Sequence, residues 1–386
     1  MKRILSVALV ATLLAASCSK TDVINPVGNQ IGFTTKMAKL TKASGEDADA
    51  ESTGLANLQA QDFRIWVYAD YEDPYTTASE LDQIYDNMKG INVTYTPASG
   101  ESQESWAPAA DYYWPGKNKA LRFFAVSGEG NHKVDVAINR TTTGEGASAV
   151  TTVAPTVTIT DYVVNNANPN TDLMVADFVC QEQTKPNVVL DFRHALTKVE
   201  FLFKTNDPKV GAVFVQSVSV GTENSGVVSG GLATKSTLTV SAPSEAKFAA
   251  KDIFTWATPV EPKVFTDDYV TPTASENFPA SFLHLGATEN AAATDIEKQA
   301  MELNTTATNF CTWLAMPQTL ADKKVRVVYV IGTRQFENYF DLATTSVTAW
   351  EENQHIKYTV TLAPNKISFS GSVDEWSTEA PDTETL

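Results

Sequence analysis

Apolar and polar residues alternate with a period of two along most of the chain from Asp62 onward. This pattern predicts half-buried β-strands, because successive side chains of a strand point to opposite faces of a sheet. Gly, Asn, Asp and Pro supply the turns between these stretches. The alternating apolar positions are Phe63, Ile65 and Val67; Val134, Val136 and Ile138; Val157 and Ile159; Val199, Phe201 and Phe203; Val325, Val327, Tyr329 and Ile331; Ile356, Tyr358, Val360 and Leu362; and Ile367, Phe369 and Val373.

Many short strands separated by turns predict an all-β protein built from sandwiches or barrels. Helical patterns are sparse, and residues 77–88 and 293–303 each predict a short helix. A polar linker, Gln181 to Asn187, marks the expected domain boundary. We therefore expect an N-terminal sandwich over residues 43–184 and a C-terminal sandwich over residues 185–386.

The N-terminus predicts export. Two basic residues precede an apolar stretch over residues 4–16, and small residues lead directly to Cys18. The stretch is shorter than the roughly 20 apolar residues that span a bilayer. This order is similar to a bacterial lipobox, which implies a signal peptide over residues 1–17 and acylation of Cys18. Ser19 after the cysteine favours sorting to the outer membrane. An ordinary secretory signal with a chance cysteine is the alternative.

The charge of the chain excludes several kinds of partner. Removing Lys2 and Arg3 with the signal takes the formal charge from −17 to about −19. Such an acidic protein is not expected to bind nucleic acid or to lie on anionic lipid through its own charges. Cys180 and Cys311 then remain, either joined by one bridge or, as the favoured interpretation, as two buried thiols.

No residue pattern predicts catalysis, a cofactor or a metal. The four histidines are widely separated and have no partners at metal-ligand spacing. His194 closes the cluster Asp191-Phe192-Arg193-His194, where a structural role at a strand end is favoured over acid–base chemistry. No nucleophile elbow, P-loop or dinucleotide fingerprint occurs. An envelope hydrolase is therefore a minor alternative.

One aromatic cluster could contact a ligand. Aromatic rings stack against sugars, although packing between sheets is the commoner role. The candidate ligand-contact residues are Trp106, Tyr112, Tyr113 and Trp114.

Several segments together resemble the fimbrillin family, the type V pilins of Bacteroidetes. The resemblance runs in order from the lipobox to the C-terminus, and it is most specific around residues 190–199. The segments are Ile31-Gly32-Phe33, Thr41-Lys42-Ala43, Asp172-Leu173-Met174-Val175-Ala176, Leu190-Asp191-Phe192-Arg193-His194-Ala195-Leu196-Thr197-Lys198-Val199, Leu314-Ala315-Met316-Pro317-Gln318, Tyr358-Thr359-Val360-Thr361-Leu362, Ile367-Ser368-Phe369 and Val373-Asp374-Glu375-Trp376.

The resemblance implies two tandem transthyretin-like, Greek-key β-sandwich domains with few short helices. It also implies an assembly mechanism. A trypsin-like envelope protease removes the first strand of the N-terminal domain, and a strand from a neighbouring subunit fills the groove. The tether and removable strand would be residues 18–42, with the cut after Lys42 or Lys39. The donor would be residues 366–376, whose Ile367, Phe369 and Val373 share one face.

The sequence therefore predicts a structural subunit, in the stalk or at the tip, of an adhesive surface pilus. Its partners would be other pilin subunits in a head-to-tail homo- or heteropolymer, the protease, the outer membrane through the lipid anchor, and a surface ligand of unknown identity. After processing, the expected location is the fimbrium. The main alternative is a monomeric surface lipoprotein that binds glycans through exposed aromatics.

Overall fold

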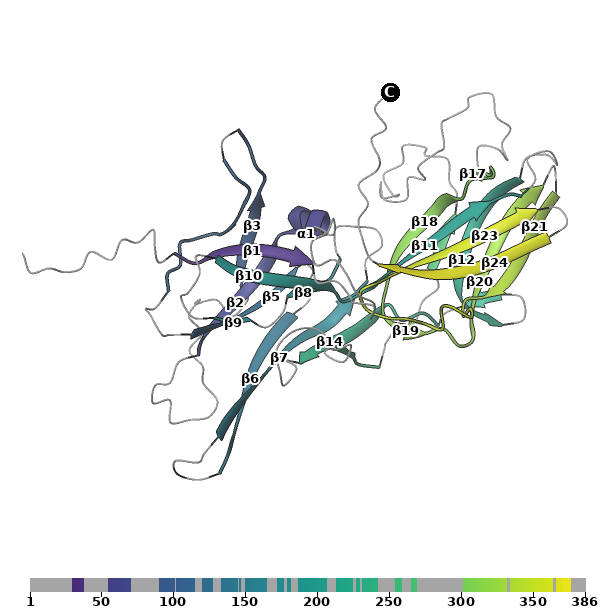
Figure 1. The fold of residues 1–386 in the computed structure, drawn as a ribbon. Helices are drawn as coiled ribbons and strands as arrows, with labels where there is room; N and C mark the ends of the chain where they lie inside the picture. The colour runs from purple at the N-terminus through teal and green to yellow at the C-terminus, as the bar shows by residue number, and fades with distance from the viewer. Residues whose placement is uncertain are drawn as a thin grey trace, which may run out of the picture.

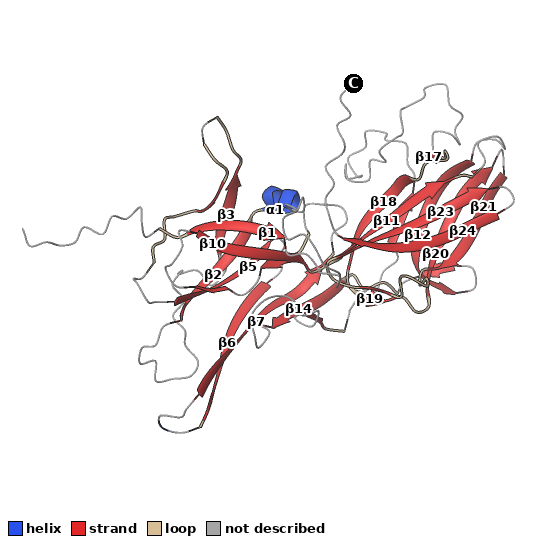
Figure 2. Ribbon diagram, viewed as in Figure 1, coloured by secondary structure: helices blue, strands red, loops and turns tan. Residues whose placement is uncertain are grey.

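The computed structural model describes residues 30–37, 55–70, 90–100, 102–114, 120–127, 133–144, 146, 150–164, 172–176, 179–181, 187–206, 213–224, 227–229, 231–241, 254–258, 265–268, 301–331, 334–363 and 366–375. Strands dominate these ranges, and the all-β prediction is confirmed (Figure 2). The helix among them is α1 (Leu55–Gln61), and no described helix is long and apolar enough to cross a membrane. The helix expected at 77–88 lies outside the described residues, and the described end of 293–303 contains strand β17 (Met301–Glu302) instead.

Seven N-terminal strands form a small closed barrel (Figure 1). Their order is β2-β3-β4-β1-β10-β8-β5, and β5 pairs with β2 over eight residues to close the ring. Neighbours are antiparallel except β1 and β10, which run parallel. The strands are β1 (Gly32–Met37), β2 (Phe63–Asp70), β3 (Ile91–Thr96), β4 (Ser105–Pro108), β5 (Ala120–Ser127), β8 (Met174–Ala176) and β10 (Asn187–His194), with β9 (Val179–Gln181) paired to β5 outside the ring.

Side chains from alternate positions of the strands fill the interior of the barrel. Phe63, Ile65 and Val67 of β2 point inward and are almost fully buried, as their spacing predicts. Leu58 of α1 also reaches this core, so the helix covers part of the barrel. Burial of such side chains is the main force that closes the ring, at about 25 cal/mol per Å² of apolar surface.

A four-stranded sheet packs against the outside of the barrel. Trp66 of β2 and Phe124 of β5 point away from the barrel interior and are buried in a second core. Val157 and Leu238 of the sheet complete that core. Strands β2 and β5 are therefore buried on both faces. The sheet has the order β15-β14-β7-β6, with β6 (Lys133–Thr143), β7 (Val150–Val163), β14 (Lys235–Ser241) and β15 (Phe254–Trp256).

The C-terminal part is a sandwich of two sheets around one core (Figure 1). The first sheet has the order β18-β11-β23-β24, and the second contains β13-β12-β20-β21, with β16 and β17 also paired to β12. The strands are β11 (Thr197–Lys204), β12 (Val213–Asn224), β13 (Val227–Ser229), β16 (Phe265–Asp268), β18 (Thr308–Ala315), β20 (Lys323–Ile331), β21 (Arg334–Asp341), β23 (Gln354–Ala363) and β24 (Lys366–Glu375), and a small pair is formed by β19 (Gln318–Thr319) and β22 (Ala349–Trp350).

Strands from both sides of the expected boundary share sheets. β10, expected to open the second sandwich, pairs with β1 and β8 inside the barrel. β14 pairs with β7 in the four-stranded sheet. The division at residues 184 and 185 and the tandem transthyretin-like arrangement stay predictions. The strand pairings join the two halves of the chain through hydrogen-bonded sheets.

A buried hydrogen-bonded pair lies where the barrel meets the C-terminal sandwich. His194 ends β10, and its Nδ1 lies 2.5 Å from Oδ2 of Asp172, just before β8. Both side chains are essentially inaccessible to water. Beside them, the Ala195 N–H donates to the carbonyl of Leu173, and the Asn353 N–H donates to the carbonyl of Leu196. The chain that leaves the barrel is thereby bound to both halves of the molecule.

We predict that Asp172→Ala lowers the free energy of unfolding by about 1–3 kcal/mol, because it removes the hydrogen bond of the buried Nδ1 of His194. Chemical denaturation measures the change. Asp135→Ala is the matched control, since Asp135 pairs with Lys133 on the exposed surface and such pairs contribute about 1 kcal/mol or less. Equal losses in the two variants would show that the buried pair has no special role in stability.

Candidate functional site

The candidate site is strand β1 and the part of the barrel that holds it. β1 joins β10 through six parallel register pairs, from Gly32 opposite Asn187 to Met37 opposite Phe192. Across its other edge, β1 pairs with β4 at a single position, Phe33 opposite Trp106. β1, the first strand among the described residues, is therefore the member that completes the ring between β4 and β10.

Two side chains anchor β1 in the barrel core. Ile31 exposes 1% of its surface and Phe33 exposes 3%. The Phe33 ring meets the rings of Phe63 and Phe123 edge-on, with centroids 6.3 and 6.2 Å apart. The next residue after Phe33, Thr34, points outward and is exposed. The short strand expected at Ile31-Gly32-Phe33 is confirmed, and it continues to Met37.

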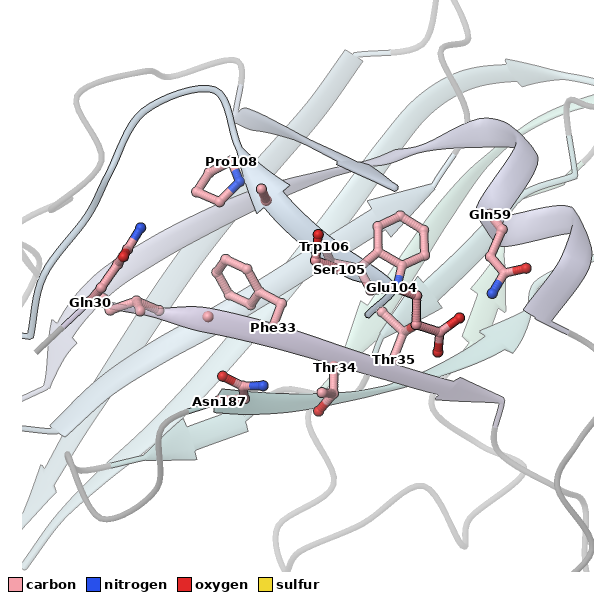
Figure 3. Close-up of a pocket in the computed structure, with 13 residues that line it drawn as sticks. Gln30, Phe33, Thr34, Thr35, Gln59, Glu104, Ser105, Trp106, Pro108 and Asn187 are labelled. Carbon is pink, nitrogen blue, oxygen red and sulfur yellow. The ribbon is translucent and has the colours of Figure 1, made fainter. Parts of the chain in front are cut away.

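A cavity of about 390 Å³ lies along the seam between β1 and β4 (Figure 3). If the Phe33–Trp106 register continued, Thr34 would face Ser105 and Thr35 would face Glu104, but the strands do not pair at these positions. All four of these residues line the cavity instead. The half of β1 toward Met37 is thus held on the β10 side and left open on the β4 side.

Polar groups surround the seam. The Tyr95 hydroxyl donates to Oε2 of Glu104 at 2.7 Å, and this hydrogen bond raises the pKa of the tyrosine. At the start of β1, the Ile31 N–H donates to the carbonyl of Tyr112 at 2.8 Å, and Gln30 Nε2 donates to Asp111 at 2.7 Å. The beginning of β1 is therefore fastened to residues 111–112.

The predicted processing residues lie outside the described residues. Cys18 precedes the first described residue, and Lys39 and Lys42 follow Met37 closely in the sequence. Lipidation and cleavage at these positions stay predictions. A cut after either lysine would break the chain between β1 and β2, because β1 ends at Met37 and β2 begins at Phe63. Non-covalent contacts alone would then hold β1 in the barrel.

The four candidate ligand-contact aromatics divide into two kinds. Trp106 exposes 8% of its surface and Trp114 exposes 5%, and both belong to the barrel core. Tyr112 packs partly against the same core, and Tyr113 is 44% exposed. A ligand-contact role for this cluster stays a prediction, and Tyr113 is the member with a large accessible surface.

The predicted donor strand is packed in its own sandwich. β24 pairs with β23 over ten residues and forms one edge of its sheet. Its Ile367, Phe369 and Val373 are partly buried against the C-terminal core. Phe369 stacks between Tyr358 and Phe340, with both ring centroids 5.2 Å away. An edge strand can leave its sheet by breaking one set of backbone bonds, whereas a central strand must break two.

The described residues offer no metal-binding cluster of three or more His, Cys, Asp or Glu side chains. His194 lies buried against Asp172, and His355 lies 3.0 Å from a carboxylate oxygen of Glu200 in the C-terminal sheet. Cys311 is buried in the sandwich core. The sequence showed His194 at a strand end, but it gave no sign of Asp172 as its partner or of the seam cavity, because both depend on strand pairings between distant segments.

Comparison with known proteins assigns the family. The family model described as fimbrillin-like matches residues 41–376, which is most of the chain. The chain belongs to this family, a family of structural proteins rather than enzymes. No curated protein matches it.

Solved structures resemble the chain at low identity. A fimbrial protein from Bacteroides vulgatus is 17% identical with a TM-score of 0.49, over 90% of this chain and 100% of its own. A fimbrial assembly protein from Parabacteroides distasonis is 11% identical with a TM-score of 0.37, over 89% of this chain and 99% of its own. These values are too low to assign a function by themselves.

We predict that Phe33→Ala lowers the free energy of unfolding of the barrel by about 3–5 kcal/mol, because it leaves a cavity between Phe63 and Phe123. Urea denaturation followed by tryptophan fluorescence measures the loss. The control is Thr34→Ala, the exposed neighbour, which should change stability by about 0.5 kcal/mol or less. If Phe33→Ala proved as mild as Thr34→Ala, β1 would not be an integral part of the barrel.

Proposed function

We propose that this protein is a subunit of an adhesive surface filament, assembled when β1 is removed and a neighbouring copy donates β24 to the vacated slot. The observation that carries the proposal is the closure of the barrel by its first strand, which is bound by six pairs on one side and one on the other. Membership of the fimbrillin-like family supports the same conclusion.

Removal of β1 would create a binding site for an extended chain. It would leave the edge of β10 from Asn187 to Phe192 without its backbone partner, and it would empty the sites of Ile31 and Phe33. A strand from another copy can satisfy both the backbone groups and the apolar slot. Such a head-to-tail contact does not close on itself, so repetition produces a filament.

The seam gives β1 a direction of release. Its start is fastened by Ile31 to Tyr112, whereas beyond Phe33 the strand no longer pairs with β4. After cleavage at Lys39 or Lys42, β1 would therefore separate from the barrel at its newly cut end first. The backbone bonds to β10, the hydrogen bond from Ile31 to Tyr112 and the burial of Ile31 and Phe33 would oppose this separation.

The sequence supports the remaining steps of the proposal, which are export, acylation, cleavage and assembly at the cell surface. The chain would be exported with a signal peptide over residues 1–17, acylated on Cys18 and held at the outer membrane until a trypsin-like protease acts. Between Cys18 and Arg64 the basic residues are all lysines, so lysine is the residue at which such a protease would cut. The two halves of the chain would act as acceptor barrel and donor sandwich, in a tandem transthyretin-like arrangement, within a homo- or heteropolymer at the cell surface.

We predict that replacing both Lys39 and Lys42 with Gln abolishes polymerisation and leaves full-length, acylated monomer at the outer membrane. Electron microscopy and N-terminal sequencing of protein from cells measure the two effects. Lys20→Gln is the control, since a cut at residue 20 would free the lipid but leave β1 in the chain. Filaments of normal length from the double variant, with Cys18 still at their N-termini, would refute the proposed processing.

A further inference from the structure

The proposed donor strand repeats the apolar spacing of the strand that it would replace. The chain reads Ile31-Gly32-Phe33 at β1 and Ile367-Ser368-Phe369 at β24. Residues two apart in a strand lie on the same face. On the strand exchange proposed above, we infer a specific register: Ile367 and Phe369 of the neighbouring copy occupy the sites of Ile31 and Phe33, and the donor runs parallel to β10.

Burial opposes a register shifted by two residues in either direction. A shift that brings Phe369 to the site of Ile31 places Gly371 at the site of Phe33 and leaves a cavity where an aromatic ring was. The opposite shift brings Asn365 to the site of Ile31, which is 1% exposed. Cavities of aromatic size cost about 3–5 kcal/mol, and an unpaired buried amide costs roughly 1–3 kcal/mol. The unshifted register avoids both penalties.

The other residues of the two strands agree with this register. Thr34 is exposed in β1, and the corresponding Ser370 is exposed in β24. Gly371 would take the place of Thr35, beside the seam cavity. In its own sandwich Gly371 leaves room for Tyr358, since a Cβ at this position would lie 3.0 Å from the ring. The outward face of the donor thus stays polar after transfer.

The direction of the donor follows from the order of the two apolar side chains. Insertion antiparallel to β10 would exchange them, placing an isoleucine between Phe63 and Phe123 and a phenylalanine at the smaller site of Ile31. Phe33 is enclosed edge-on by those two rings. The smaller side chain would leave a gap there, and overpacking at the other site costs roughly a further 1–3 kcal/mol. Parallel insertion keeps each side chain in a site of matching size.

Disulfide trapping between copies tests the register. Val189 lies opposite Thr34 in the β1–β10 pairing and is 40% exposed. The inference places Ser370 of the donor opposite Val189. A chain carrying Val189→Cys and Ser370→Cys is assembled under reducing conditions, checked by electron microscopy against the parent chain, and then oxidised. Residues paired across neighbouring strands lie within the 4.4–6.8 Å Cα range of a disulfide, whereas residues two positions out of register lie beyond it.

Three matched variants combine Val189→Cys with a cysteine at another donor position. Ser368→Cys and Ser372→Cys report the two shifted registers, and Lys366→Cys reports antiparallel insertion. The parent chain controls for its own cysteines. We expect Ser370→Cys to give a ladder of covalent multimers on non-reducing gels, at least about tenfold stronger than any of the others.

The results distinguish a failure of the inferred register from a failure of strand exchange. A dominant ladder from any of the three matched variants would overturn the inferred register while leaving strand exchange intact. Filaments of the parent chain with no ladder from any variant would overturn it as well. A processed parent chain that never assembles would instead refute the proposed function, and the register with it.

Discussion

The structure of the N-terminal barrel depends on one strand. Phe33 of β1 and Ile31 just before it supply two core side chains, and β1 is the link between β4 and β10 in the ring. Its backbone is bound fully along β10 but at one position along β4. A ring closed in this way is complete while β1 is present, and becomes an open sheet with an apolar slot when β1 leaves. Stability of the monomer and readiness to accept another strand are thus two consequences of the same contact.

Contacts at the junction between barrel and sandwich join the two halves of the chain. Three of the segments that carry the family resemblance meet there. Asp172 pairs with His194 inside the protein, Thr197 pairs with Ala315 across strands β11 and β18, and Met316 packs into the core under the barrel wall. Because the acceptor slot and the donor strand lie in different halves, a junction of this kind holds them in a defined relation within each subunit.

The alternation of apolar and polar residues predicted which segments form strands better than it predicted which strands pair. The alternation at Phe63, Val199 and Ile356 identified strands that the structure contains, because burial of every second residue depends only on local spacing. Closure of the barrel depends on β2 meeting β5 and on β1 meeting β10, some 155 residues apart in register. The polar linker before β10 suggested a boundary, yet pairing carries β10 back to the first strand. Trp106 and Trp114 were candidate ligand contacts, but both rings enter the core, which is the commoner role of aromatic residues in such folds. The seam cavity arises where two strands diverge, which no residue pattern records.

A filament structure determined by cryo-electron microscopy, at a resolution that distinguishes side chains, would test strand exchange directly. We expect a strand from a neighbouring subunit between β4 and β10 of each barrel, with a phenylalanine between Phe63 and Phe123 and no density for residues 30–37. Filaments in which each subunit retains its own β1 in that position would contradict it.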